Sequence, residues 1–182
     1  MTVDDTDYAI RRAEPSDAAG LASVHEATWR ETYVGLLPEP LLKALTADAR
    51  TVAWRRILGG TPGYLSTTYV AERAGCLVAF GSCGEQRDEA FAAAGYAGEF
   101  TAVYVRKTDQ RRGLGTRLMK AMMSDLAGRG LVGFTLWVPR ENIPARSLYE
   151  QLGGRLVGQR QAPHQDGTLN EVAYGWPRSA EK

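Results

Sequence analysis

The sequence has few of the residues that build disulfide scaffolds or metal centres. Its 182 residues include two cysteines, Cys76 and Cys83, and two histidines. If both cysteines lie on one strand, seven residues separate them by roughly 23 Å and turn them to opposite faces, which is too far for a mutual bridge. We therefore expect reduced packing cysteines, no metal site and a cytoplasmic protein.

Long apolar runs and an excess of one charge are also missing. No run approaches the ~20 apolar residues needed to cross a bilayer, and the acidic, polar opening MTVDDTDYAIRR is unlike a secretory signal peptide. The formal net charge is +1, from 22 basic and 21 acidic residues. We expect no membrane or nucleic-acid partner, so basic residues matter here only where they gather locally.

The composition is that of an ordinary globular protein, with 44% hydrophobic and 24% charged residues. No repeat or linker divides the chain, so we expect one α/β domain over residues 1–182, with a core from about 8 to 177 and short polar tails. Strands are predicted at 8–13, 67–72, 76–83, 99–105, 131–138, 155–161 and 169–176. Helices are predicted at 16–33, through 41–45, and at 48–58, 115–127 and 142–152.

The stretch Arg106–Lys120, RKTDQRRGLGTRLMK, is the most informative part of the chain. It joins an apolar strand, 102–105, to an amphipathic helix. A Gly-rich turn at a helix N-terminus offers unpaired N–H groups and the positive end of the helix dipole to an anion. Six basic side chains crowd the stretch, and Asp109 is its only acid. We expect a polyphosphate ligand.

The motif does not fit two common phosphate-binding loops. A P-loop needs Lys and then Ser or Thr directly after its last glycine, and Thr116-Arg117 does not supply that order. A Rossmann fingerprint needs three glycines, and only Gly113 and Gly115 are present. The pattern from Gln110 to Gly115, placed after a strand, instead resembles the acetyl-CoA loop of the GCN5-related N-acetyltransferases.

A second segment, one predicted strand later, is also similar to this family. Asn142, Ala145, Tyr149 and Gly153 keep the spacing of the family's N-x-x-A-x-x-[FL]-Y-x-x-x-G segment. The segment from Trp29 to Pro38 resembles a PaiA-like bacterial branch. The resemblance covers nearly the whole chain and implies a mixed sheet of about six to seven strands, flanked by four or more helices. In that fold two splayed strands form the acyl-CoA slot.

The resemblance further implies that acetyl-CoA is the co-substrate. Backbone groups of the strand before the loop would hold the pantetheine arm and polarise the thioester carbonyl, the loop would hold the pyrophosphate, and Asn142 would touch the cofactor arm besides capping its helix. The expected cofactor-binding residues are Val103, Tyr104, Val105, Gln110, Arg111, Arg112, Gly113, Leu114, Gly115, Thr116 and Asn142.

Proton transfer needs an acid and a base. The Tyr149 phenol, which keeps its proton at neutral pH, is the expected general acid; a tyrosine packed in the core is the alternative. Glu99 is the expected general base, with a solvated glutamate and a water chain as the alternative. Trp29 and Tyr33, on one helix face with His25, are the expected acceptor-binding residues, although aromatics at this spacing also form cores.

These residues predict an N-acetyltransferase that transfers the acetyl group of acetyl-CoA to a primary amine of a small molecule, polyamines included, by direct attack in a ternary complex. A protein N-terminal or lysine acetyltransferase and a non-catalytic CoA-binding sensor remain alternatives. We expect a monomer or homodimer. Whether the acids near the expected acceptor side attract a cation or form a solvated surface stays open; they are Asp17, Glu26, Glu31, Glu85, Asp88, Glu89 and Glu99.

Overall fold

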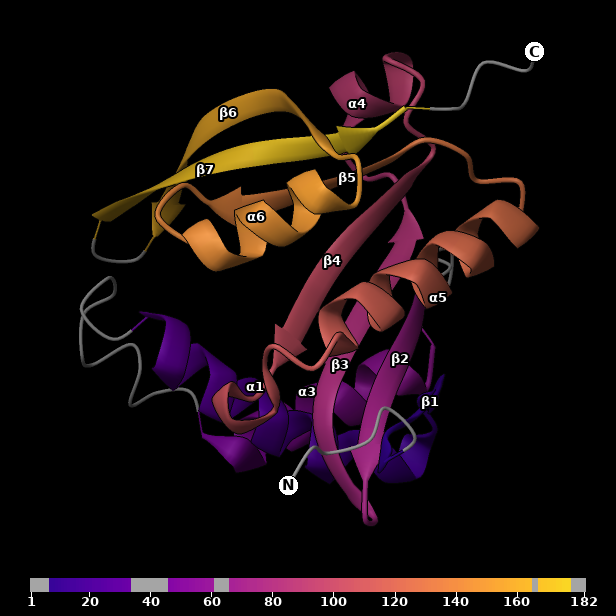
Figure 1. The fold of residues 1–182 in the computed structure, drawn as a ribbon, viewed down its shortest axis with the longest axis vertical. Coiled ribbons are helices and arrows are strands. Elements are labelled where there is room, and N and C mark those ends of the chain that lie inside the picture. Colours follow the sequence, from indigo (N-terminus) through magenta and orange to yellow (C-terminus); the bar gives the residue numbers. More distant parts are fainter. Residues whose placement is uncertain (1–6, 34–45, 61–65, 165–166, 178–182) are drawn as a thin grey trace. The chain divides into compact units, whose positions relative to one another are not determined.

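The structure, a computed structural model, describes residues 7–33, 46–60, 66–164 and 167–177. Seven strands form a mixed sheet in the order β1-β2-β3-β4-β5-β7-β6 (Figure 1). Five α-helices lie within the described residues. The expected α/β fold is therefore confirmed. Contacts divide the chain into two compact units, the first formed by Met1–Ser82 with Ala102–Met122 and the second by Cys83–Thr101 with Met123–Lys182.

The elements follow one another as β1 (Ala9–Arg12), η2 (Pro15–Asp17), α1 (Ala18–Tyr33), α3 (Ala47–Leu58), β2 (Ser66–Arg73), β3 (Cys76–Glu85), α4 (Glu89–Ala93), β4 (Gly98–Val105), η3 (Lys107–Asp109), α5 (Leu114–Gly128), β5 (Phe134–Pro139), α6 (Ile143–Gln151), β6 (Arg155–His164) and β7 (Gly167–Trp176). Here η marks a short 3₁₀ turn. β3, β4 and α5 have residues in both units.

The core of the first unit lies on both faces of its strands. On one face, α1 and α3 bury Leu21 and Trp54 against Val70 and Phe80. On the other face, the first turns of α5 pack on β2 and β3 (Figure 1). There a Cβ on Gly81 would lie 2.7 Å from the Met122 side chain, so a glycine allows α5 to approach β3 closely.

In the second unit, β7 lies between β5 and β6 and pairs antiparallel with both. Its last residue, Trp176, meets Phe100 of β4 and Tyr149 of α6 edge to face, with ring centroids 5.7 and 6.1 Å away. The Trp176 indole also donates a hydrogen bond to the Leu152 carbonyl. A single aromatic side chain thus joins β4, α6 and β7.

The expected and observed boundaries differ most at β5 and in the β6–β7 hairpin. β5 begins at Phe134 rather than Leu131, because Gly130 and Gly133 both have positive φ and the chain turns between them. β6 and β7 extend to His164 and Gly167, so the expected loop at 163–167 is shorter than predicted. The helix predicted through 41–45 lies outside the described residues. Within the part that the structure describes, no helix is long and apolar enough to span a membrane.

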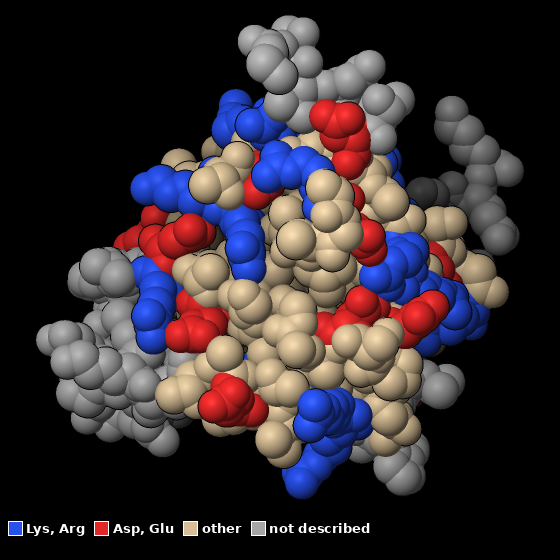
Figure 2. Space-filling model, turned by 90° about the horizontal axis from the view of Figure 1, so that it is seen from below, with Lys and Arg blue, Asp and Glu red and all other residues tan. Residues whose placement is uncertain are grey.

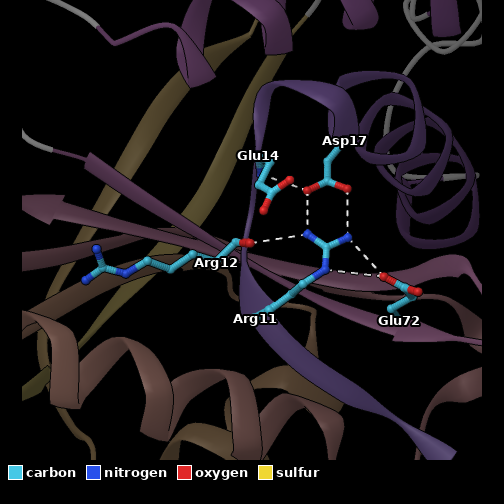
Figure 3. Close-up of polar contacts among 5 residues, drawn as sticks. All are labelled: Arg11, Arg12, Glu14, Asp17 and Glu72. Atoms are coloured by element: carbon cyan, nitrogen blue, oxygen red, sulfur yellow. Dashed lines mark hydrogen bonds and ion pairs between the residues drawn. The ribbon is translucent and has the colours of Figure 1, made fainter.

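An ion-pair cluster fixes the entry to α1. Arg11 of β1 donates to both carboxylate oxygens of Asp17, at 2.7 and 2.9 Å, and to Glu72 of β2 at 2.9 Å (Figure 3). The Asp17 carboxylate also accepts the backbone N–H of Glu14. The Arg11 guanidinium holds the pKa of Asp17 below its usual range. The cluster therefore joins β1, β2 and the turn that precedes α1.

Removing the Asp17 charge should lower stability at neutral pH and matter less in acid. A lowered folded-state pKa means that the stabilisation is present above the unfolded pKa of about 4 and is lost as the pH falls through the folded value. We expect Asp17→Asn to lower the Tm by about 2–4 °C at pH 7, which is about 1 kcal/mol for a partly exposed pair in a chain of this size. Thermal melts from pH 7 to pH 3 should show the gap closing in acid. Glu26→Gln, which breaks the more exposed pair with Arg30, serves as the control and should shift the Tm less.

Candidate active site

The Gly-rich stretch forms a tight turn between β4 and α5 (Figure 1). Arg111 and Gly113 both adopt positive φ, 60° and 73°. The N–H of Arg117 donates to the Gly113 carbonyl at 3.0 Å, which starts the helical hydrogen bonds of α5. The N–H groups from Leu114 to Thr116 consequently precede the first intrahelical bond, as an anion site at a helix start requires.

The loop keeps its polar side chains outside and its apolar one inside. Gln110, Arg111 and Arg112 are exposed, whereas Leu114 is buried against the strands of the first unit. The Gln110 amide folds back to donate to the Val105 carbonyl at 3.1 Å. A Cβ built on Gly113 would meet no atom within 4 Å. The backbone between Gln110 and Thr116 is therefore open to a phosphate ligand.

β4 leads into this loop with half-buried side chains at Val103, Tyr104 and Val105. Its parallel pairing with β5 has Gly98 opposite Phe134 and Glu99 opposite Thr135. By comparison, β5 pairs with β7 along all six of its residues, Phe134 to Pro139. The short β4–β5 ladder is the geometry expected of strands that diverge after their first residues.

An aromatic group surrounds His25 in the first unit. The imidazole stacks on Tyr104 at 5.3 Å and has the rings of Phe80, Trp29 and Trp54 within 6.0 Å. Its Nδ1 is buried without a hydrogen-bond partner. Burial, assisted by the charge of nearby Arg50, lowers the His25 pKa to about 4. His25 is accordingly neutral at pH 7.

Two residues predicted for different roles meet inside this group. The Trp29 indole donates to the Tyr104 hydroxyl at 3.0 Å, so an expected acceptor-binding residue contacts an expected cofactor-binding residue. Trp29 is half buried. Tyr33 ends α1, and its side chain lies outside the described part of the structure.

Glu99 forms an ion pair with Arg87 that the sequence does not predict. Its carboxylate accepts a hydrogen bond from the Arg87 guanidinium, which belongs to the segment between β3 and α4. The Glu99 side chain is 11% exposed and that of Arg87 is 62% exposed. Glu99 is thus a largely buried carboxylate that already binds a cation reaching in from solvent.

The two expected residues of α6 have defined local positions. Tyr149 is buried, with its ring 5.8 Å from that of Tyr174 and beside Trp176. The Asn142 side chain accepts the Ala145 N–H at 3.3 Å and so caps α6. Because Trp176 contacts both Phe100 and Tyr149, the residue after Glu99 and the expected acid pack on one indole.

Several acids considered for attracting a cation have local partners. Asp17 pairs with Arg11, Glu26 pairs with Arg30, and Glu31 accepts the backbone N–H of Lys107. Asp88 caps α4 through the N–H groups of Ala90 and Phe91. Figure 2 shows acidic and basic side chains interspersed on the face that it presents. These four acids are therefore held by local partners.

Comparison with known proteins finds similarity to N-acetyltransferases. The sequence model of the FR47-like protein family matches residues 82–162, which include the loop and both predicted motifs. The uncharacterized N-acetyltransferase YuaI of Bacillus subtilis is 29% identical over 170 residues, which cover 92% of each chain. These matches support a place in the GCN5-related N-acetyltransferase superfamily. The matched residues contain both motifs that the sequence predicts for this superfamily, the loop and the α6 segment.

Solved structures agree on the fold at low sequence identity. PaiA N-acetyltransferase from Thermoplasma acidophilum, solved with coenzyme A, superposes with a TM-score of 0.66 at 15% identity, covering 93% of this chain and 99% of its own. A ribosomal-protein alanine N-acetyltransferase from Escherichia coli superposes with a TM-score of 0.64 at 21% identity, covering 96% of each chain. Similarity at this level establishes the acetyltransferase fold alone.

Three features of this acetyltransferase escaped the sequence analysis. Arg87 is one of many charged residues in a polar stretch, and nothing local marks it as the partner of Glu99. The sequence marks His25 only by its helical spacing with Trp29. Tyr8 and Asp109 are 101 residues apart in the chain but form a hydrogen bond of 3.1 Å. Such long-range pairs leave no local signal in a single sequence.

Proposed function

We propose that this acetyltransferase transfers the acetyl group of acetyl-CoA to a primary amine of a small cationic molecule. The turn at the start of α5 carries the proposal. Its N–H groups from Leu114 to Thr116 precede the first intrahelical bond, its backbone is open at Gly113, and exposed Arg111 and Arg112 flank it. These are the donors and charges that a pyrophosphate requires.

Bound acetyl-CoA supplies an activated acyl thioester. In this proposal the loop from Gln110 to Thr116 binds its phosphates. Backbone groups of Val103–Val105 hydrogen-bond the pantetheine arm and polarise the thioester carbonyl. This assignment is supported by the short pairing of β4 with β5, which involves Gly98 and Glu99 and not Val103–Val105. The Val105 carbonyl is held by Gln110, so a backbone N–H of this stretch is the group assigned to the thioester carbonyl. Asn142 contacts the arm while capping α6.

Two side chains of the second unit are assigned to proton transfer. Glu99 accepts a proton from the substrate ammonium, directly or through water, so that the neutral amine attacks the carbonyl carbon. The carbon–nitrogen bond forms and the carbon–sulfur bond breaks, and the Tyr149 hydroxyl gives its proton to the departing thiolate. The excess proton on the new amide nitrogen returns to the Tyr149 phenolate, directly or through water. Phe100, which follows Glu99, and Tyr149 both contact the Trp176 ring. This supports assigning the two proton-transfer roles to one site.

The Arg87–Glu99 pair supports a cationic acceptor. A largely buried carboxylate that holds a solvent-exposed guanidinium also suits an ammonium group of a substrate, which would take the place of Arg87. Trp29 and Tyr33 are assigned to acceptor binding in this proposal, since aromatic faces favour cations. Small amines, polyamines among them, are the substrate class with this chemistry.

Cofactor placement is tested at Gly113. A carboxylate at this position would face the phosphates and carry the strain of positive φ, so Gly113→Asp should abolish the Tm increase that CoA causes in the wild type. Gly130→Asp is a matched control, because Gly130 also has positive φ and open space around it but follows the opposite end of α5. Differential scanning fluorimetry with CoA checks both variants. A full CoA shift in Gly113→Asp would overturn the placement.

The role of Tyr149 is tested by removing its hydroxyl. Tyr149→Phe keeps the ring against Trp176, so it should bind CoA as tightly as the wild type while lowering kcat by about 10²–10⁴-fold. Tyr174→Phe, which removes a hydroxyl from the neighbouring ring, should keep kcat within a few-fold. Free-thiol release under conditions where chemistry limits turnover measures both variants. An unchanged kcat would make Tyr149 a packing residue.

Acceptor chemistry is tested at Arg87. Arg87→Gln removes the guanidinium that occupies Glu99, so the KM for spermidine should fall by about two- to fivefold, the size expected for an exposed pair. Arg160→Gln is the control, because Arg160 makes a comparable exposed pair with Glu171. The assay compares spermidine, glutamate and a peptide with a free N-terminus. A preference for glutamate would contradict the proposal, and a preference for the peptide would favour the protein acetyltransferase.

A further inference from the structure

Tyr8 holds the cofactor loop at both ends. Its hydroxyl donates to the Asp109 carboxylate at 3.1 Å, one residue before the loop begins at Gln110. Its backbone carbonyl accepts a hydrogen bond of 2.9 Å from the Arg117 guanidinium, one residue after the loop ends at Thr116. Tyr8 directly precedes β1 and is buried. Tyr8 is thus hydrogen-bonded to the residues on either side of the loop, Asp109 before it and Arg117 after it.

The hydroxyl end of this connection is a buried charged network. Asp109 is 1% exposed and has three partners. Arg73, at the end of β2, donates to the same carboxylate oxygen at 2.9 Å and to the Tyr8 hydroxyl at 3.0 Å. Thr108 donates to the other oxygen at 2.7 Å. Since a buried carboxylate is stable only when its charge is neutralised and its oxygens are bonded, these contacts fix where the loop begins.

The guanidinium of Arg73 also lies over the Tyr8 ring, 5.5 Å from its centroid. The ring is therefore held by a cation while its hydroxyl both accepts from that cation and donates to Asp109. Donor and acceptor capacity of the phenol are both used. This leaves the Tyr8 hydroxyl with a single arrangement in which the network is satisfied.

We infer that Tyr8 is a positioning residue for the cofactor, which sets the affinity of the loop for CoA by fixing its two ends relative to each other. The inference rests on the proposed function of the loop. A loop that must present consecutive N–H groups to one pyrophosphate loses affinity when its ends move, because the ordering then happens on binding. Tyr8 acts through Asp109 and Arg117, and it need not touch the ligand.

The coupling is reciprocal. If Tyr8 favours the CoA-binding form of the loop, bound CoA must favour the arrangement in which Tyr8 is held, by the same factor. The strand that follows, Ala9–Arg12, pairs with β2 next to Arg73. Cofactor binding should therefore stabilise β1, although β1 is far from the loop in sequence.

Isothermal titration of CoA into wild type and Tyr8→Phe tests the inference. Tyr8→Phe keeps the ring and the backbone carbonyl and removes only the hydroxyl. We expect its Kd for CoA and its KM for acetyl-CoA to rise by about three- to tenfold, the range of one ordinary hydrogen bond, because the hydroxyl acts on the ligand only through the loop. The kcat at saturating acetyl-CoA should stay within about twofold. Tyr69→Phe is the control: it removes a hydroxyl from the adjacent strand, where it accepts from Arg12, and should leave the Kd unchanged.

The outcomes separate the two levels of the proposal. If the wild type does not bind CoA, the proposed function itself fails. If the wild type binds CoA but Tyr8→Phe binds equally well, with or without a lower Tm, the hydroxyl is only structural and the inference is overturned. An equal loss in Tyr69→Phe overturns it too. Hydrogen exchange of the wild type provides a test that needs no variant, since CoA should slow exchange across Ala9–Arg12; unchanged exchange there contradicts the coupling.

Discussion

The buried carboxylate of Asp109 is the constraint on which the loop depends. A carboxylate with 1% exposure is tolerated only with a counter-charge and donors, and these come from Arg73 of β2, Tyr8 before β1 and Thr108 beside it. The end of β2 and the residue before β1 therefore both contact Asp109, just ahead of the turn into α5. One charge thus ties the sheet of the first unit to the backbone conformation at Arg111 and Gly113.

The second unit depends on aromatic packing in a similar way. Trp176 ends β7 and contacts Phe100 and Tyr149, and its indole N–H is bonded to the Leu152 carbonyl. A residue near the end of the chain therefore sets the position of α6 beside the start of β4. Glu99, next to Phe100, gains a fixed position from the same contacts, and Arg87 balances its charge.

Cofactor binding and acceptor choice would have different physical origins in the proposed function. There the loop at α5 binds a pyrophosphate through its backbone, which needs only a Gly-rich turn at a helix start. The acceptor is instead selected by individual side chains such as the Arg87–Glu99 pair. The solved structures with 15–21% identity share the fold alone.

The sequence by itself determined the order of most elements, the Gly-rich turn before α5 and the helix α6. Apolar periodicity, Gly113 with its neighbours, and the Asn142 cap are local signals, and local signals are readable from one chain. The predicted start of β5 at Leu131 is nevertheless wrong, because the apolar run from Leu131 onward gives no sign of the positive φ of Gly133. Only the tertiary structure decided that Asp109 is buried against Tyr8 and Arg73, that Glu99 is held by Arg87, and that His25 is neutral among four aromatic rings. These facts depend on which distant residues share a face of a sheet, and packing and desolvation, which fix those charges, exist only once the chain has folded.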